Sequence, residues 1–164
     1  MTLHSAMNDI PFTSTTITTP TRTTYQGLTQ SPSISALILL RGGSALETGL
    51  KRTIPDCVTG RILIQSNIRT GEPQLHYLKL PPSIKEDEAV LVLDAQMSSG
   101  GAALMAVQVL VDHGVEVGRI VFVTYLAGGR GLGRLCKVFP EVRVVVGEVV
   151  EEEERWVERR YFGC

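Results

Sequence analysis

Short, mostly apolar runs alternate with amphipathic stretches along most of the chain. Continuous apolar runs are typical of strands that are buried on both faces of a parallel sheet. They predict strands at 35–40, 61–65, 88–93, 120–124 and 142–146. Apolar residues at helical spacing predict helices at about 45–52, 102–113 and 131–138. This alternation predicts an α/β fold with a mainly parallel central sheet flanked by helices.

One predicted pair of strands breaks the parallel pattern. The stretch 74–80 should be the antiparallel partner of 61–65, because only the loop 66–73 joins them. The one basic side chain of that loop is Arg69. We expect a β-hairpin whose loop flexes over an active site, and a second flexible loop at 125–131.

The beginning of the chain has a different composition. Residues 1–33 show no helical or strand periodicity, and 13–24 is almost entirely Ser and Thr. Such a polar tract buries too little apolar surface to offset its ordering entropy. We therefore predict a mostly disordered segment over 1–33 and one folded domain over 34–164.

Composition excludes several classes of protein. The formal net charge is −1 at pH 7, so bulk electrostatics imply no nucleic-acid partner. No apolar run approaches the ~18 residues of a membrane span, and the start lacks the pattern of a secretory signal. Cys57, Cys136 and Cys164 form neither a disulfide framework nor a zinc-binding spacing. We expect a cytoplasmic protein without a membrane partner.

The stretch 90–113 carries the strongest chemical signal. A buried run ends in Asp94, and Ser98-Ser99-Gly100-Gly101 then leads into the helix from about Ala102. The backbone N–H groups of such a loop and the positive end of the following helix form an anion site. A carboxylate beside that site can accept hydrogen bonds from two hydroxyls. The pattern predicts a ligand with both a diol and a phosphate, such as a ribose 5-phosphate.

Four short motifs occur in one order along the chain. They are Ile-Leu-Leu-Arg-Gly-Gly at 38–43, Gly-Arg-Ile-Leu-Ile-Gln at 60–65, Leu-Asp-Ala-Gln-Met-Ser-Ser-Gly-Gly at 93–101 and Arg-Tyr-Phe-Gly at 160–163. Together they resemble the uracil phosphoribosyltransferases, a family of type I phosphoribosyltransferases. Residues 70–77 look closest to the corresponding domain of uridine kinase-like proteins.

The resemblance implies a site for phosphoribosyl pyrophosphate (PRPP) at the carboxyl ends of the strands. Asp94 would bind the ribose hydroxyls, and Arg41 would bind pyrophosphate, with Arg69 as a second contact. Asp94 and Arg41 are the predicted catalytic residues. The implied cradle for the 5-phosphate consists of Met97, Ser98, Ser99, Gly100, Gly101 and Ala102, and Gln96 is a further implied PRPP contact. The alternative for Arg41 is an ion pair with Glu47. The same resemblance makes 25–30 a candidate hairpin strand.

Two departures from the family's pattern bear on activity. Ser66 stands where the family has an arginine that meets pyrophosphate, and Asn67 replaces an aspartate. The glutamate-rich stretch 148–158 replaces the Gly/Pro-rich segment that reads the uracil edge. The base-binding residues stay open, with three aromatic candidates: Tyr125, Tyr161 and Phe162.

The resemblance implies transfer of phosphoribosyl from PRPP to uracil, giving UMP and pyrophosphate. It also implies Mg²⁺ that arrives with PRPP rather than in a dedicated metal site, GTP as a candidate allosteric activator, and a homodimer or other homo-oligomer. Two alternatives stay open. One is a catalytically weakened module that binds PRPP or nucleotides and accompanies a uridine kinase, and the other is a structural interaction domain.

Overall fold

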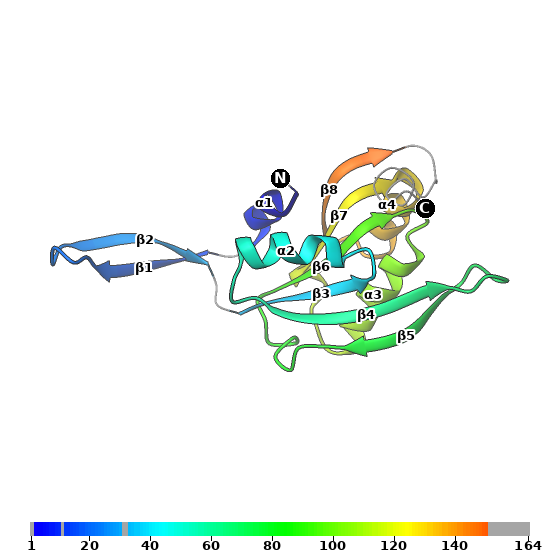
Figure 1. Ribbon diagram of the computed structural model, residues 1–164, viewed down its shortest axis with the longest axis horizontal. Coiled ribbons are helices and arrows are strands. Elements are labelled where there is room, and N and C mark those ends of the chain that lie inside the picture. The colour runs from blue at the N-terminus through cyan, green and yellow to red at the C-terminus, as the bar shows by residue number, and fades with distance from the viewer. Residues whose placement is uncertain (1, 11, 31–32, 151–164) are drawn as a thin grey trace.

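A six-stranded sheet with the strand order β5-β4-β3-β6-β7-β8 forms the centre of the protein (Figure 1). The computed structural model describes residues 2–10, 12–30 and 33–150. The strands are β3 (Ile34–Leu40), β4 (Val58–Ser66), β5 (Pro73–Lys79), β6 (Ala89–Met97), β7 (Ile120–Gly128) and β8 (Arg143–Val150). All neighbours are parallel except β4 and β5, which pair antiparallel. The predicted α/β fold and its antiparallel hairpin are confirmed.

Helices cover both faces of the sheet, which is why the central strands are apolar on both sides. The helices α3 (Gly101–Asp112) and α4 (Gly129–Val138) pack on one face with Val92 and Phe122. The helix α2 (Ser44–Thr53) packs on the other face, with Leu91 and Val123 beneath it. A short 3-10 helix, η2 (Val117–Arg119), precedes β7.

Strands β6 and β7 extend further than their apolar runs predict. Asp94 pairs with Thr124 and Met97 pairs with Ala127, so the backbone ladder continues three residues or more beyond the predicted strand ends. Parallel pairing needs only backbone N–H and C=O groups, and polar side chains are tolerated where a strand emerges from beneath its helices. Asp94 therefore lies inside a strand and has a fixed backbone.

The first 30 residues pack in two different ways. The helix α1 (Thr2–Ala6) and the 3-10 helix η1 (Met7–Asp9) lie on the α2 face, where Ala6 and Ile10 are buried. The strands β1 (Phe12–Thr18) and β2 (Thr24–Gln30) form an antiparallel hairpin that projects away from the sheet (Figure 1). The candidate hairpin strand at 25–30 lies within β2. Composition alone favoured disorder here, but β-branched threonines also suit a strand pair.

Candidate functional site

Asp94 and the loop that follows β3 meet at the carboxyl ends of two adjacent strands. Strands β3 and β6 are parallel neighbours, with Ile38 opposite Leu93. A Cβ atom on Gly42 would lie 3.1 Å from Asp94 Oδ1, and one on Gly43 would lie 2.1 Å from the carbonyl oxygen of Leu93. The two glycines after Arg41 thus allow this loop to lie directly against the strand that carries Asp94.

The side chain of Asp94 is largely buried, and its protonation is perturbed. Burial raises the pKa of Asp94 from 3.8 to about 7, although backbone hydrogen bonds from Gln96 and Ala95 oppose the rise. The Gln96 N–H donates to Asp94 Oδ1 at 3.5 Å. A carboxyl group that burial drives toward its neutral form has unmet capacity to accept hydrogen bonds, so a ligand with hydroxyl donors would stabilise its charged form.

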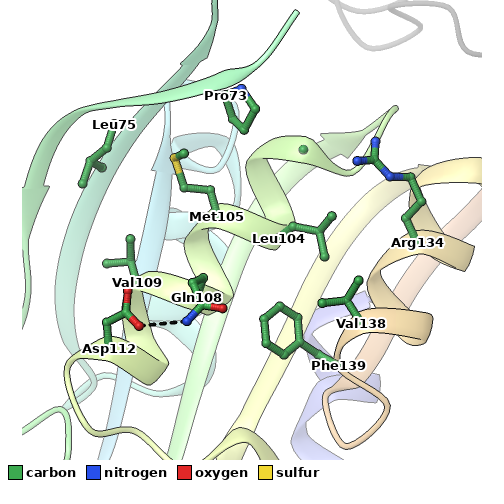
Figure 2. A pocket seen from close by; sticks show the side chains of 11 residues that line it. Pro73, Leu75, Leu104, Met105, Gln108, Val109, Asp112, Arg134, Val138 and Phe139 are labelled. Atoms are coloured by element: carbon green, nitrogen blue, oxygen red, sulfur yellow. Dashed lines mark hydrogen bonds between the residues drawn. The ribbon is translucent and has the colours of Figure 1, made fainter.

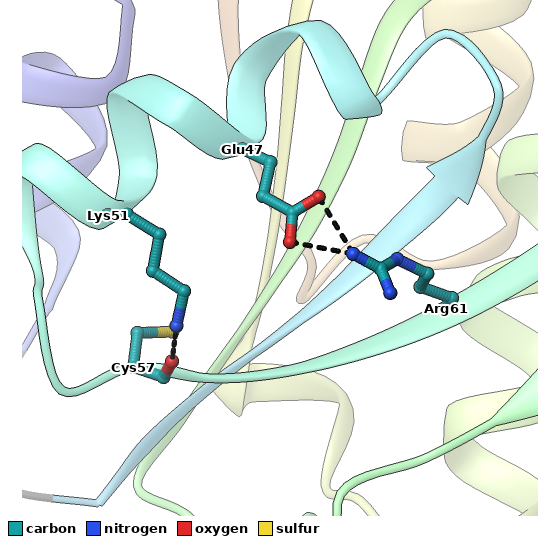
Figure 3. Close-up of polar contacts among 4 residues, drawn as sticks. All are labelled: Glu47, Lys51, Cys57 and Arg61. Atoms are coloured by element: carbon teal, nitrogen blue, oxygen red, sulfur yellow. Dashed lines mark hydrogen bonds and ion pairs between the residues drawn. The ribbon is translucent and has the colours of Figure 1, made fainter.

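The guanidinium of Arg41 is exposed, and Glu47 is occupied by another arginine. Arg61 Nη2 contacts Glu47 Oε1 at 3.0 Å and Oε2 at 3.1 Å (Figure 3). No carboxylate of the described residues forms an ion pair with Arg41. Because none of these carboxylates holds its guanidinium, Arg41 is available to an anionic ligand, and its planar set of donors suits phosphate oxygens. The peptide bond between Leu40 and Arg41 is cis.

The loop after β6 presents uncapped backbone N–H groups. Helix α3 begins at Gly101, and its N-cap residue Gly100 has φ 78° and makes no side-chain capping bond. The first N–H groups of such a helix have no intrahelical acceptor, which makes them donors for an anion. Of the other predicted PRPP-binding residues near this loop, Met97 has its side chain in the core, Ser99 is exposed, and Gln96, Ser98 and Ala102 are partly buried.

The structure does not bring Arg69 to Asp94 or Arg41. Arg69 lies exposed in the turn of the β4–β5 hairpin, where Asn67 Oδ1 accepts the backbone N–H of Arg69 at 2.8 Å. The base of the hairpin is closer to the site, since Pro73 Cδ lies 3.7 Å from the position of a Cβ on Gly101. Arg69 would reach a ligand at Asp94 only if the hairpin turn moved.

The base-binding candidates are only partly placed. Tyr125 lies near the carboxyl end of β7, is 39% exposed, and has its ring beside Gly147 of β8. Tyr161, Phe162 and the motif 160–163 lie outside the described residues, as does most of the glutamate-rich stretch. Only Tyr125 of the three aromatic candidates therefore has a known position.

A largely apolar cavity of about 480 Å³ lies on the outer side of α3 (Figure 2). It is bounded by β5, α3 and α4, and it reaches Gly101 and Arg134 beside the loop after β6. Within the described ranges no group of three or more His, Cys, Asp or Glu is arranged to hold a metal ion. None of the described helices is long and apolar enough to span a membrane.

Sequence analysis missed two residues that contact the loop after β6. The predicted flexible loop at 125–131 is instead the end of β7 and the first turn of α4. There, a Cβ on Gly131 would lie 2.2 Å from the carbonyl oxygen of Ser98. One turn later, Arg134 Nη1 donates to the carbonyl oxygen of Ser99 at 2.8 Å. The only sequence signal was the three glycines at 128, 129 and 131, since the contacts join elements that are distant in sequence.

Comparisons with known proteins identify the family of the chain. The family described as uracil phosphoribosyltransferase matches residues 1–157. The chain is 39% identical over 140 residues to a uracil phosphoribosyltransferase of Dictyostelium discoideum, covering 85% of this chain and 64% of the relative. It is 36% identical over 173 residues to a uridine kinase of Saccharomyces cerevisiae, covering 97% of this chain and 34% of the relative. The chain thus spans less than two thirds of either relative.

Solved structures share the fold at low sequence identity. A protein from Aquifex aeolicus superposes with a TM-score of 0.84 at 23% identity, covering 98% of this chain and 80% of that one. A purine phosphoribosyltransferase from Pyrococcus horikoshii superposes with a TM-score of 0.53 at 16% identity, covering 74% of this chain and 83% of that one. These likenesses agree with the type I phosphoribosyltransferase fold that the sequence predicted.

Proposed function

The chain belongs to the uracil phosphoribosyltransferase family, and we propose that it transfers the phosphoribosyl group of PRPP to uracil, giving UMP and pyrophosphate. The observation that carries the proposal is the juxtaposition of Asp94 with two loops. The Arg41 loop lies against Asp94, and the uncapped start of α3 follows a few residues further along the same strand. This arrangement supports the proposal, in which Asp94 accepts from the diol, Arg41 is the cationic donor and the start of α3 is the phosphate site.

Each of these groups has a distinct task in the proposed reaction. The bond from the ribose C1 to pyrophosphate breaks, the bond from C1 to the base nitrogen forms, and that nitrogen loses its proton. The ribose becomes oxocarbenium-like on the way, as in glycoside hydrolysis. Asp94 would hold the ribose hydroxyls, Arg41 would stabilise the departing pyrophosphate, and the N–H groups after Ser98 would hold the 5-phosphate. Mg²⁺ would enter as part of the substrate, bound to PRPP oxygens.

A second candidate function is a catalytically weakened module that binds PRPP or a nucleotide. The observation in its favour is Ser66, which supplies no cation where the family has an arginine, while Arg69 contacts neither Asp94 nor Arg41 in the structure. The match to a uridine kinase of which this chain spans 34% is consistent with a kinase-associated role. Regulation by GTP would belong to either function.

We further propose that the protein is cytoplasmic. We also propose that it forms a homodimer through the β1–β2 hairpin. Phe12 and Leu28 lie on one face of this two-stranded arm, and Ile17 and Tyr25 lie on the other. All four are exposed, Leu28 to 74%. A hairpin with apolar side chains on both faces is marginal in water alone. Light scattering of the Leu28→Asp variant tests this proposal, since a dimer that uses the arm would dissociate and an unaffected mass would exclude it.

The decisive experiment is conversion of labelled uracil to UMP with Mg²⁺ and PRPP. Three proteins are compared: the wild type, Asp94→Asn, and Asp112→Asn as a matched control. Asp112 lies at the far end of α3, where its carboxylate accepts from Gln108 at 2.8 Å. Product that Asp94→Asn loses and Asp112→Asn keeps would support the transferase. PRPP binding without product would favour the module, and failure of the folded wild type to bind PRPP, UMP or GTP would exclude both.

A further inference from the structure

Helix α4 contacts the loop after β6, and the proposed reaction assigns no role to this contact. The two segments touch backbone to backbone, because the position of a Cβ on Gly131 is 2.2 Å from Ser98 O and that of a Cβ on Gly100 is 2.8 Å from Gly131 O. One turn further along α4, Arg134 Nη1 donates to Ser99 O at 2.8 Å. Figure 2 shows the guanidinium of Arg134 extending from α4 toward this loop.

The hydrogen bond from Arg134 fixes the orientation of one peptide plane. In a trans peptide the C=O and the following N–H point in opposite directions. Because the Ser99 carbonyl is turned toward Arg134, the N–H of Gly100 is turned away from it. Gly100 has φ 78°, and a glycine populates positive and negative φ about equally. Rotation of this plane is therefore intrinsically easy, and it would exchange the carbonyl oxygen and the N–H.

The orientation of this plane matters for an anion bound at the start of α3. An N–H directed at a phosphate attracts it, whereas a carbonyl oxygen in the same place repels it. The backbone contact with Gly131 limits how far the loop can shift, but it supplies no donor to the Ser99 carbonyl. Arg134 supplies that donor. It is exposed, and it is not one of the residues already assigned to the ligand.

We propose that Arg134 is a positioning residue that holds the Ser99–Gly100 peptide in its phosphate-binding orientation and thereby sets the affinity for the 5-phosphate end of PRPP. The inference rests on the proposed function, since it assigns the loop to that phosphate. Arg134 acts through the backbone, so it should affect binding of the phosphoribosyl end. It should leave binding at Arg41, on the other loop, unchanged.

The test uses the full chain and three variants. Arg134→Met removes the donor but keeps an apolar stem against the cavity that Arg134 lines. Arg134→Lys restores a charged donor that can reach the carbonyl. Lys137→Met removes a positive charge from the same helix, at an exposed position with no hydrogen bond to the loop. It therefore controls for the general loss of charge.

Two probes separate the two ends of the substrate: ribose 5-phosphate and magnesium pyrophosphate. Their dissociation constants, and that of PRPP, are measured by calorimetry. A hydrogen bond from a charged donor is worth about a tenfold change in a binding constant. When the loop populates two orientations, the apparent affinity falls in proportion to the fraction that has the binding orientation. Arg134→Met should weaken PRPP and ribose 5-phosphate about tenfold and leave pyrophosphate unchanged. Arg134→Lys should recover most of the loss, and Lys137→Met should match the wild type.

The outcomes separate this inference from the proposed function. Ribose 5-phosphate that binds Arg134→Met as tightly as wild type would overturn the inference alone. Equal weakening of both probes, or the same effect from Lys137→Met, would also overturn it, because it would indicate general damage or charge. A wild-type protein that binds PRPP to no measurable extent would overturn the proposed function and this inference together.

Discussion

Replacing Asp94 with asparagine should stabilise the folded protein at alkaline pH and abolish its affinity for PRPP. Asparagine has nearly the same shape, and its side-chain oxygen can still accept the N–H of Gln96, which lies 3.5 Å from Asp94 Oδ1. It carries no charge, however, so the folded state no longer holds a largely buried carboxylate. The fold should remain while the acceptor for two ribose hydroxyls is lost.

The size of the stabilisation follows from the pKa of Asp94. Burial raises that pKa from 3.8 to about 7, so the folded state binds a proton more tightly than the unfolded chain. The stability that this proton contributes is complete below 3.8 and is lost as the pH rises through 7. At pH 8 the charged side chain destabilises the fold by about 4 kcal/mol, and at pH 5 by about 2 kcal/mol. The wild type should therefore lose roughly 2–3 kcal/mol between these pH values through Asp94 alone.

Urea denaturation at pH 5 and pH 8 measures this difference. The free energy of unfolding of Asp94→Asn, minus that of the wild type, should increase by roughly 2–3 kcal/mol from pH 5 to pH 8. Subtraction removes the groups that titrate in both proteins. A difference for Asp94→Asn that does not change between pH 5 and pH 8 would refute the reasoning from burial. A rise in melting temperature with PRPP that survives in Asp94→Asn would refute its assignment to the ribose.

Three further predictions concern packing and charge. Gly43→Ala should lower the free energy of unfolding by about 3 kcal/mol or more, because the new Cβ would lie 2.1 and 2.8 Å from two backbone carbonyl oxygens. Gly129→Ala is the control in thermal denaturation, since a Cβ there would meet nothing within 4 Å. Ser35→Ala should cost about 1–3 kcal/mol in urea denaturation, because its hydroxyl donates to the buried carboxylate of Asp87. Arg41→Met should lower kcat/KM for PRPP without changing the melting temperature, and an unchanged kcat/KM would exclude Arg41 from the site.

Much of the fold could be predicted because its cause is local in the sequence. Runs such as Val90 to Leu93 are apolar at every position, and only a strand covered on both faces buries all of them. The hairpin could be predicted because only the short loop 66–73 joins its two strands. The beginning of the chain was harder to predict, because Ala6 and Ile10 are buried only against a sheet formed by distant residues.

From residue 34 onward the sequence by itself determined the order of strands and helices along the chain. It also identified Asp94 and the loop after it as the place where a phosphorylated ribose could bind. Only the tertiary structure decided which distant groups meet there. It placed Gly42 against the carboxylate of Asp94, gave Glu47 to Arg61 rather than Arg41, and brought Arg134 to the carbonyl of Ser99. Periodicity reports the burial of a residue within its own element. Contacts between elements depend on strand order and on backbone distances of a few ångströms, which no local pattern encodes.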